Sequence, residues 1–144
     1  MHIETLIKAS EKDLREITEV VAQLSNNAQQ LTLSHLREIL SRAESRIFVA
    51  RDSSGSIVGT LFVAWYCGLT SNKMWIEDVV VDKGSRGQGI GRSLVTAALD
   101  AAKEAGFKGK IMLTSRPTRV EAHALYKSLG FEEYDTGVFV IRIQ

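Results

Sequence analysis

A glycine-rich turn between a strand-like and a helix-like segment constrains the fold of this chain more than any other feature. The turn reads Arg86-Gly87-Gln88-Gly89-Ile90-Gly91. Residues 75–82 before it are rich in β-branched side chains, and residues 92–105 after it carry apolar side chains at helical spacing. Glycines permit positive φ, and the first N–H groups of a helix lack intrahelical partners. This order of elements therefore predicts a phosphate or pyrophosphate site at the turn.

Two better-known phosphate-binding motifs do not fit this turn. A dinucleotide-binding GxGxxG motif needs a third glycine where Arg92 or Leu94 stands. A P-loop that begins at Gly84 needs a lysine where Ile90 stands. Taken alone, the glycines are also compatible with a plain connection between a strand and a helix. The prediction of an anion site therefore depends on the place of the turn, between a strand-like segment and a helix-like one.

Periodicity and turn residues predict a single α+β domain over residues 1–144. Ser10 with Asp13, and Thr118 with Glu121, are typical of helix starts, and Gly106 and Gly130 of helix ends. We expect a mixed, mostly antiparallel sheet of about six to seven strands with four helices, in the order β-α-α-β-β-β-α-β-α-β-β. The expected strands are 3–8, 46–51, 57–66, 74–81, 109–114 and one or two near Tyr134 and 138–143; the expected helices follow Ser10 and span 34–43, 92–105 and 119–129.

Composition argues against several classes of protein. The chain is 44% apolar and 24% charged, with a net charge of +1, which favours an ordinary globular protein without a general attraction to nucleic acid. Its apolar runs are far shorter than a membrane span, and its first residues do not resemble a signal peptide. The three histidines lie far apart, so no metal site is expected. The single cysteine, Cys67, excludes an internal disulfide and favours a cytoplasmic location.

The turn resembles a signature of the GNAT superfamily of N-acetyltransferases, Gln/Arg-x-x-Gly-x-Gly/Ala. The preceding strand Val79-Val80-Val81-Asp82 and the later block Ala124-Leu125-Tyr126-x-x-Leu129-Gly130-Phe131 match the same family in order and spacing. The resemblance implies the acyl-CoA N-acyltransferase fold. It also implies direct transfer of the acetyl group of acetyl-CoA to a primary amine of a small molecule or peptide, without a covalent enzyme intermediate.

The resemblance also implies where the cofactor binds. In the family the turn grips the pyrophosphate, and the strand before it splays from the next strand so that the pantetheine arm pairs with free backbone groups. Arg119 stands where many members carry Asn, so we expect it to meet a cofactor phosphate or an acidic substrate group instead. The expected cofactor-binding residues are Val79, Val80, Val81, Arg86, Gly87, Gln88, Gly89, Ile90, Gly91, Arg92 and Arg119.

Transfer to an amine needs a base for the amine proton and an acid for the departing thiolate. Tyr126 aligns with the family's tyrosine, and a phenol with a pKa of about 10 is protonated at neutral pH. Glu77 interrupts an apolar strand, and alternation places it on the face of Trp75, Val79 and Val81, so we predict Tyr126 as the acid and Glu77 as the base. We expect no direct part in the chemical step for three other side chains. Asp78 on the opposite face is structural, His123 packs or tunes Tyr126, and Cys67 is a buried or half-buried bystander.

A second function stays open, namely a CoA-binding sensor or interaction module of the same fold that has lost turnover. The presence of both Glu77 and Tyr126 favours the enzyme. We expect an acceptor pocket lined by the first two helices and their loop, by residues 66–72 and by the C-terminal strands. The acceptor can be a small primary amine, an amino sugar, a peptide N-terminus or a lysine side chain. Homodimers are common in the superfamily, and the sequence leaves a homodimer open.

Overall fold

The computed structural model describes residues 1–25 and 30–144 of the chain. These residues form two compact units, Met1–Thr114 and Ser115–Gln144, and each is described by itself. Most of the polar loop expected between the first two helices lies outside the described residues. Among the described residues, no helix combines the length and apolar character needed to cross a membrane. A single domain over residues 1–144 remains a prediction.

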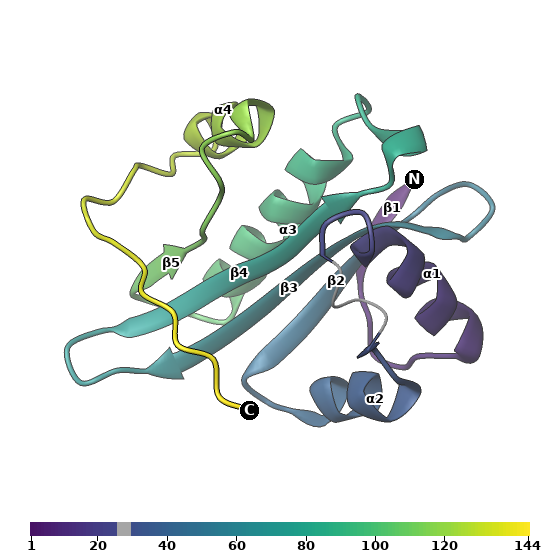
Figure 1. Cartoon of the computed structure of the whole chain (residues 1–144), viewed down its shortest axis with the longest axis horizontal. Coiled ribbons are helices and arrows are strands. Elements are labelled where there is room, and N and C mark those ends of the chain that lie inside the picture. The colour runs from purple at the N-terminus through teal and green to yellow at the C-terminus, as the bar shows by residue number, and fades with distance from the viewer. Residues whose placement is uncertain (26–29) are drawn as a thin grey trace. The chain divides into compact units, whose positions relative to one another are not determined.

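The first unit is a five-stranded sheet with helices on both faces (Figure 1). The strands lie in the order β1-β2-β3-β4-β5; neighbours are antiparallel up to β4, and β5 is parallel to β4. This mixed α+β sheet confirms the expected fold class, with fewer strands than expected in the described residues. The elements are β1 (His2–Thr5), α1 (Glu11–Val21), α2 (Leu33–Ser41), β2 (Ser45–Arg51), β3 (Ile57–Cys67), β4 (Asn72–Val81), η2 (Lys83–Ser85), α3 (Ile90–Glu104) and β5 (Lys110–Met112).

Helices α1 and α2 cover one face of the sheet, and α3 covers the other (Figure 1). Ile17 of α1 and Leu36 of α2 form a buried cluster with Ile47 and Val49 of β2. On the opposite face, α3 approaches β3 at Gly59. A Cβ added there would lie only 3.1 Å from Leu94 Cδ1 and 3.3 Å from Ile90 Cγ2. The absence of a side chain at this position therefore lets the first turns of α3 pack directly on the sheet.

Hydroxyl side chains begin the first two helices. Ser10 and Asp13 form the expected capping box: the Asp13 N–H donates to Ser10 Oγ at 3.1 Å, and the Ser10 N–H donates to Asp13 Oδ2 at 3.0 Å. For α2 the expected start at Ser34 is wrong, because Thr32 Oγ1 accepts the His35 N–H at 3.1 Å instead. Both residues can cap a helix, and the backbone turns two residues earlier than the pattern indicates.

The second unit contains one helix, α4 (Val120–Ser128), among its described residues. The expected capping box of Thr118 and Glu121 is wrong: Arg119 is the N-cap, and among the described residues no side chain caps this helix. The Val120 N–H donates to the Thr118 carbonyl at 3.0 Å instead. The helix ends as expected at Gly130, whose φ is 96°, and the Phe131 N–H donates back to the Tyr126 carbonyl at 3.0 Å.

The closing strands expected near Tyr134 and over residues 138–143 are absent from the described residues, where no strand follows α4. Alternating β-branched and aromatic side chains indicate a preference for extended backbone, and residues 138–143 have that pattern. A strand also needs a neighbouring strand for its N–H and C=O groups, and the side-chain pattern holds no information about that neighbour. Because these closing strands do not form, the described residues contain fewer strands than expected.

Candidate active site

A β-bulge interrupts β4 at the centre of the sheet. Phe62 of β3 pairs with Glu77 and Thr60 pairs with Val80, so two residues of β4, Asp78 and Val79, lie where one would fit. Asp78 has a φ of 52°, and it is the one non-glycine residue with positive φ in the described ranges. The Oγ1 of Thr60 donates to the Asp78 carbonyl at 3.0 Å. Backbone strain of this kind persists where the surroundings enforce it, and it is common at functional sites.

The bulge overturns two expectations about side-chain direction. Residues paired with Thr60 and Phe62 share one face of the sheet, so Glu77 and Val80 are on the same face, rather than Glu77, Val79 and Val81. Asp78 was expected to be structural on the opposite face, but it lines a pocket on the side of α1 and α2. Simple alternation along the whole strand predicts the wrong faces, because the bulge is defined by the pairing of β4 with β3 and residues 74–81 carry no local signal of it.

Beyond the bulge, one edge of β4 is open in the first unit. Strand β5 pairs with β4 from Lys73–Lys110 to Trp75–Met112, and within the described residues of Met1–Thr114 no later residue of β4 pairs with it. Figure 1 shows β5 beside the first part of β4. The side chain of Val80 is buried, so it packs in the core while the backbone at this edge lacks a paired strand in the first unit. An unpaired stretch of this kind is what the family resemblance implies for the pantetheine site.

The glycine turn has the backbone conformation that an anion site needs. Gly87 has a φ of 79° and Gly89 a φ of 77°, and Gly89 is the N-cap of α3. Among the described residues, no side chain caps the start of this helix. A Cβ added at Gly87 or Gly89 would meet no described heavy atom within 4 Å. The glycines are therefore required by the left-handed backbone rather than by crowding, and the N-terminus of α3, which has no side-chain cap, suits an anion.

A glutamine that the sequence analysis missed holds the start of this turn. Gln23, just after α1, donates from Nε2 to Asp82 Oδ1 at 2.8 Å and accepts the Lys83 N–H on Oε1 at 2.9 Å. The other oxygen of Asp82 accepts the Gly84 N–H at 3.0 Å. Arg86, expected at the phosphate, donates from Nε to the Val81 carbonyl at 3.1 Å, so it also ties the turn to the end of β4. No local pattern could identify Gln23, because its partners lie about 60 residues away.

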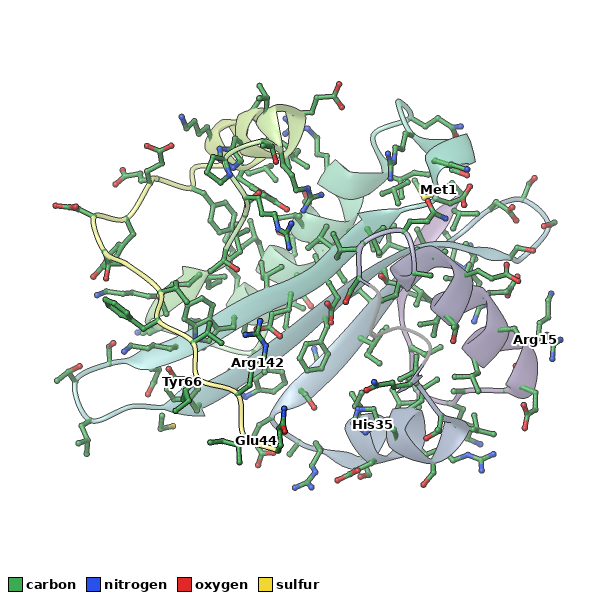
Figure 2. The ribbon with its side chains drawn as sticks, in the orientation of Figure 1. Met1, Arg15, His35, Glu44, Tyr66 and Arg142 are labelled. Carbon is green, nitrogen blue, oxygen red and sulfur yellow. The ribbon has the colours of Figure 1, made fainter. Side chains whose placement is uncertain are left out.

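A pocket of about 610 Å³ lies between α1, α2 and the centre of the sheet. The first two helices line it, as expected for an acceptor site, but residues 66–72, which were also expected to line that site, are absent from its described lining. Most of its described lining residues are aliphatic or aromatic, and the polar side chains among them are Ser25, Gln30, His35, Thr60 and Asp78. His35, labelled in Figure 2, comes from α2, and Asp78 comes from the bulge of β4.

The two neighbouring carboxylates of the bulge have raised pKa values. Burial raises the pKa of Glu77, and the charge of Asp78 raises it further. Burial alone raises the pKa of Asp78, although its side chain keeps contact with solvent. A side chain at the mouth of a concave site can have both a pKa raised by burial and contact with solvent, because protein atoms surround it on most sides while water still reaches it. A carboxylate with a raised pKa accepts a proton from an amine more readily than a free one does.

The second unit contains the remaining expected site residues. Tyr126 is buried, and its ring packs edge-on against Phe131, with 5.9 Å between the centroids and 63° between the planes. Burial raises the pKa of Tyr126, and the positive charge of Arg119 lowers it in part, so the phenol keeps its proton at neutral pH. His123 Nε2 lies 2.9 Å from the Arg116 carbonyl, so the histidine fixes the loop before α4.

The expected residues thus fall into two groups. Glu77, Val79–Val81 and Arg86–Arg92 follow one another along β4, the turn and α3, whereas Arg119 and Tyr126 belong to the second unit. Cys67 was expected to be buried or half-buried, but it is exposed at the end of β3, where the hairpin to β4 begins. Among the described residues, no group of three or more His, Cys, Asp or Glu could hold a metal ion.

A strand with an open edge, followed by a glycine turn and an uncapped helix, is the arrangement that the two sequence blocks led us to expect. The family model described as the acetyltransferase (GNAT) family matches residues 9–131 of the chain. The chain belongs to the GNAT family. This confirms the resemblance and, with it, the fold.

Two curated relatives of this GNAT chain are named for the acetylation of streptothricin and of aminoglycosides. Over 89 residues it is 37% identical to streptothricin acetyltransferase from Streptomyces lavendulae, a match that covers 62% of this chain and 46% of the relative. Over 112 residues it is 30% identical to aminoglycoside N(6')-acetyltransferase type 1 from Stenotrophomonas maltophilia, a match that covers 74% of this chain and 72% of that relative. The chain therefore spans about half the length of the first relative and most of the second.

Solved structures with the same fold carry more than one kind of name. An acetyltransferase from Trypanosoma brucei superposes with a TM-score of 0.80 at 25% identity, over 98% of this chain and 99% of that one. A transcriptional regulator from Bacillus halodurans superposes with a TM-score of 0.79 at 30% identity, over 98% and 100%. The fold alone therefore does not give the activity of this GNAT chain.

Proposed function

We propose that this GNAT protein is an N-acetyltransferase that transfers the acetyl group of acetyl-CoA directly to a primary amine, with no covalent enzyme intermediate. The observation that carries this proposal is the uncapped N-terminus of α3, preceded by two positive-φ glycines and placed directly after the open edge of β4. Backbone N–H groups aimed at one point suit a pyrophosphate, and an open strand edge suits an extended amide-containing arm.

The proposed donor site uses backbone groups more than side chains. The N–H groups of residues 87–91 hold the pyrophosphate, and the backbone of Val79–Val81 pairs with the pantetheine arm. Arg86 holds the turn through the Val81 carbonyl, and we assign Arg92 and Arg119 to the phosphates. The turn at Gly87 and Gly89 supports this fit, because a Cβ added at either glycine would meet no described heavy atom within 4 Å.

In the proposed reaction, the amine nitrogen attacks the thioester carbonyl, a C–N bond forms, and the C–S bond breaks. Glu77 accepts the proton that the amine loses, which its raised pKa favours. Tyr126 donates its phenolic proton to the departing thiolate, and its raised pKa keeps that proton available at neutral pH. The proton on Glu77 then returns to the Tyr126 phenolate through solvent, which restores both side chains. The net change moves the acetyl group to the amine and one amine proton to the thiolate, with no change of oxidation state.

A CoA-binding module without turnover is the second candidate. The regulator name of one structural neighbour favours it, since that protein shares the fold at 30% identity. The raised pKa values of Glu77 and Asp78 favour the enzyme, because perturbed carboxylates beside a pocket are typical of catalytic sites.

Thiol release from acetyl-CoA across a panel of primary amines separates the two candidates. We expect release with at least one amine and a lower rate in Tyr126→Phe, which keeps the ring and removes the proton donor. Binding of CoA without release on any amine, together with no effect of Tyr126→Phe, would support the module instead.

The remaining parts of the proposal concern the whole protein. We propose one catalytic domain over residues 1–144 in the cytoplasm, acting on a small-molecule or peptide amine, with no nucleic-acid or membrane partner. The exposed free thiol of Cys67 supports a reducing compartment. Light scattering at micromolar concentration tests the homodimer that the family resemblance leaves open.

A further inference from the structure

The walls of the pocket between α1, α2 and the sheet are mainly hydrocarbon. Ile17 and Val21 line it from α1, Leu36 and Ile39 from α2, and Ile47 and Phe62 from the sheet. Its volume of about 610 Å³ is within the range of small-molecule sites. Burial of apolar ligand surface against such walls contributes about 25 cal/mol per Å². The main attraction that this pocket offers is therefore to an apolar body.

The same pocket carries one acidic side chain among the described residues that line it, Asp78. The other titratable group that faces the pocket there is His35 from α2. Glu77 is the next residue along the bulge and is absent from the described lining. An ammonium group moved into an apolar site without a partner is costly, so a cationic acceptor has to place its nitrogen at Asp78.

One carboxylate on apolar walls distinguishes between classes of amine. Aminoglycosides carry several ammonium groups and many hydroxyls, and each of these would need a polar partner when it leaves water. The described lining offers five polar side chains, Ser25, Gln30, His35, Thr60 and Asp78, which is fewer than the ammonium and hydroxyl groups of an aminoglycoside such as kanamycin. A molecule with a single amino group and a hydrocarbon body has one charge for Asp78 and apolar surface for Leu36, Ile39 and Phe62.

We propose that the acceptor of this enzyme is a monoamine with an aromatic or branched aliphatic body, which lies in the pocket while its ammonium group binds the carboxylate of Asp78 at the mouth. This inference rests on the proposed function, because it names the acceptor of the same reaction. Asp78 is then a binding residue, whereas Glu77 beside it accepts the proton. The bulge brings the two roles to adjacent positions, with Asp78 held in its strained backbone by the Thr60 hydroxyl.

The test compares 2-phenylethylamine and isopentylamine with glucosamine and kanamycin on the full chain. Two readouts are needed: kcat and KM from thiol release, and binding of each amine without acetyl-CoA by calorimetry. We expect kcat/KM for the two hydrocarbon amines to exceed that for glucosamine and kanamycin by roughly tenfold or more. The alcohol 2-phenylethanol, which has the same body without the charge, should bind more weakly than 2-phenylethylamine.

The variant Asp78→Asn tests the role of the carboxylate. Asparagine adopts positive φ as readily as aspartate, so this change removes the charge and keeps the backbone conformation. We expect KM for 2-phenylethylamine to rise roughly tenfold or more, because a charged hydrogen bond is lost, with a smaller change in kcat. Glu77→Gln should lower kcat instead. Asp100→Asn, an exposed acid on α3, is the matched control and should change neither constant.

The outcomes separate this inference from the proposed function. If glucosamine or kanamycin is the better substrate, or if Asp78→Asn leaves KM unchanged, the inference is overturned and the acetyltransferase stands. If 2-phenylethylamine binds through Asp78 but no amine is acetylated, the proposed function fails and the pocket assignment stands. If none of the hydrocarbon amines binds, the inference is overturned.

Discussion

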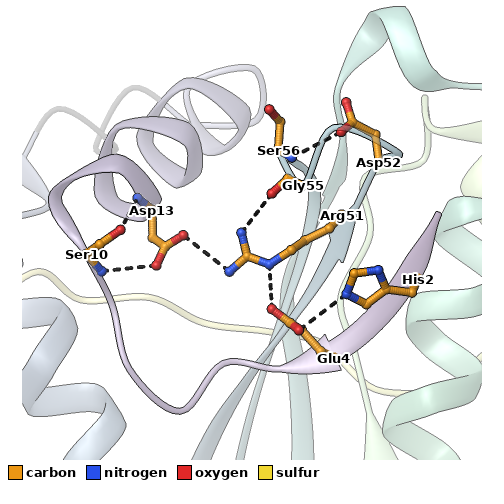
Figure 3. A network of polar contacts seen from close by, with 8 residues as sticks. All are labelled: His2, Glu4, Ser10, Asp13, Arg51, Asp52, Gly55 and Ser56. Carbon is orange, nitrogen blue, oxygen red and sulfur yellow. Dashed lines mark hydrogen bonds and ion pairs between the residues drawn. The ribbon is translucent and has the colours of Figure 1, made fainter.

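The Nη2 of Arg51 lies 3.2 Å from Asp13 Oδ1, which joins the end of β2 to the first turn of α1 (Figure 3). The same guanidinium donates from Nε to Glu4 on β1 and from Nη1 to the Gly55 carbonyl in the hairpin, the latter at 3.0 Å. Its side chain is only 18% exposed. One arginine therefore ties three segments of the first unit to α1, the helix that forms one wall of the pocket described above.

Replacing this arginine should destabilise the first unit. Arg51→Met leaves Asp13 and Glu4 without their cation, and we expect a loss of about 2 kcal/mol in the free energy of unfolding. Urea denaturation followed by circular dichroism measures it. Arg42→Gln is the matched control, because Arg42 pairs with Glu38 on the surface of α2 and is 62% exposed; it should cost only about 0.5 kcal/mol or less. Equal losses in the two variants would contradict the assignment.

The same cluster predicts how stability depends on pH. The Arg51 hydrogen bond lowers the pKa of Glu4; burial opposes the shift at Asp13, but hydrogen bonds from Ser10 and Arg51 outweigh it and lower that pKa too. A lowered pKa in the folded state adds stability above the unfolded pKa, about 4, and this stability is lost as pH falls through the folded pKa. The urea midpoint should therefore drop below pH 4. Arg51→Met should lose less of its remaining stability on acidification, and an identical drop would refute the linkage.

The rate of acetyl transfer should also depend on pH through Glu77. Burial raises its pKa, the adjacent Asp78 charge raises it further, and only the ionised carboxylate accepts a proton. We therefore expect kcat to rise with pH through an apparent pKa above about 4.3, the usual value for Glu. Asp78 lies next to Glu77 and its charge acts on that pKa, so the profile is compared with Asp78→Asn as well as Glu77→Gln. An acidic limb that survives unchanged in Glu77→Gln would exclude Glu77 as the base.

Gln23 should control the affinity for CoA without touching it. Gln23→Leu removes both hydrogen bonds to Asp82 and Lys83, which frees the start of the turn. We expect CoA to bind roughly three- to tenfold more weakly by calorimetry, because the hydrogen bonds that hold the turn in place contribute about 1 kcal/mol to the binding free energy. Gln23→Glu should be at least as harmful, since its carboxylate faces that of Asp82. Lys12→Gln, an exposed change on α1, serves as the control and should leave CoA affinity unchanged.

Two substitutions at Gly89 separate backbone strain from charge at the anion site. Gly89→Ala meets no described atom within 4 Å but forces a Cβ into a left-handed conformation, so it should cost about 1–2 kcal/mol of stability or binding. Gly89→Asp adds a negative charge where the pyrophosphate is proposed to bind, and it should abolish CoA binding. Calorimetry with CoA measures both. Similar affinities in the two variants would show that no anion binds at this turn.

Local chemistry was sufficient to predict much of the fold. The Ser10–Asp13 capping box and the glycine helix ends depend on residues within five positions of one another, and each is present as expected. The turn after β4 was predictable for the same reason, because Gly87 and Gly89 are needed wherever φ is positive. Each of these features is specified by the residues that form it and by their near neighbours in the sequence.

Features that depend on distant partners could not be predicted in this way. The bulge at Asp78 exists because β3 pairs with β4 on both sides of it, and Gln23 matters because of a turn far along the chain. The expected strand over residues 138–143 has the right side chains, yet the described residues give it no neighbour. Pairing and tertiary contact, rather than propensity, decided each of these cases.

Gly59 has a consequence for how the donor site can vary. It pairs with Val81, the last residue of β4 before the glycine turn, and it also lies under Ile90 at the beginning of α3. A methyl group here would push the helix outward from its first turn while leaving every proposed ligand residue intact. If the proposed diphosphate binds at the turn, its depth depends on the smallest residue of an adjacent strand, and substitutions at Gly59 should change donor affinity without altering a contact residue.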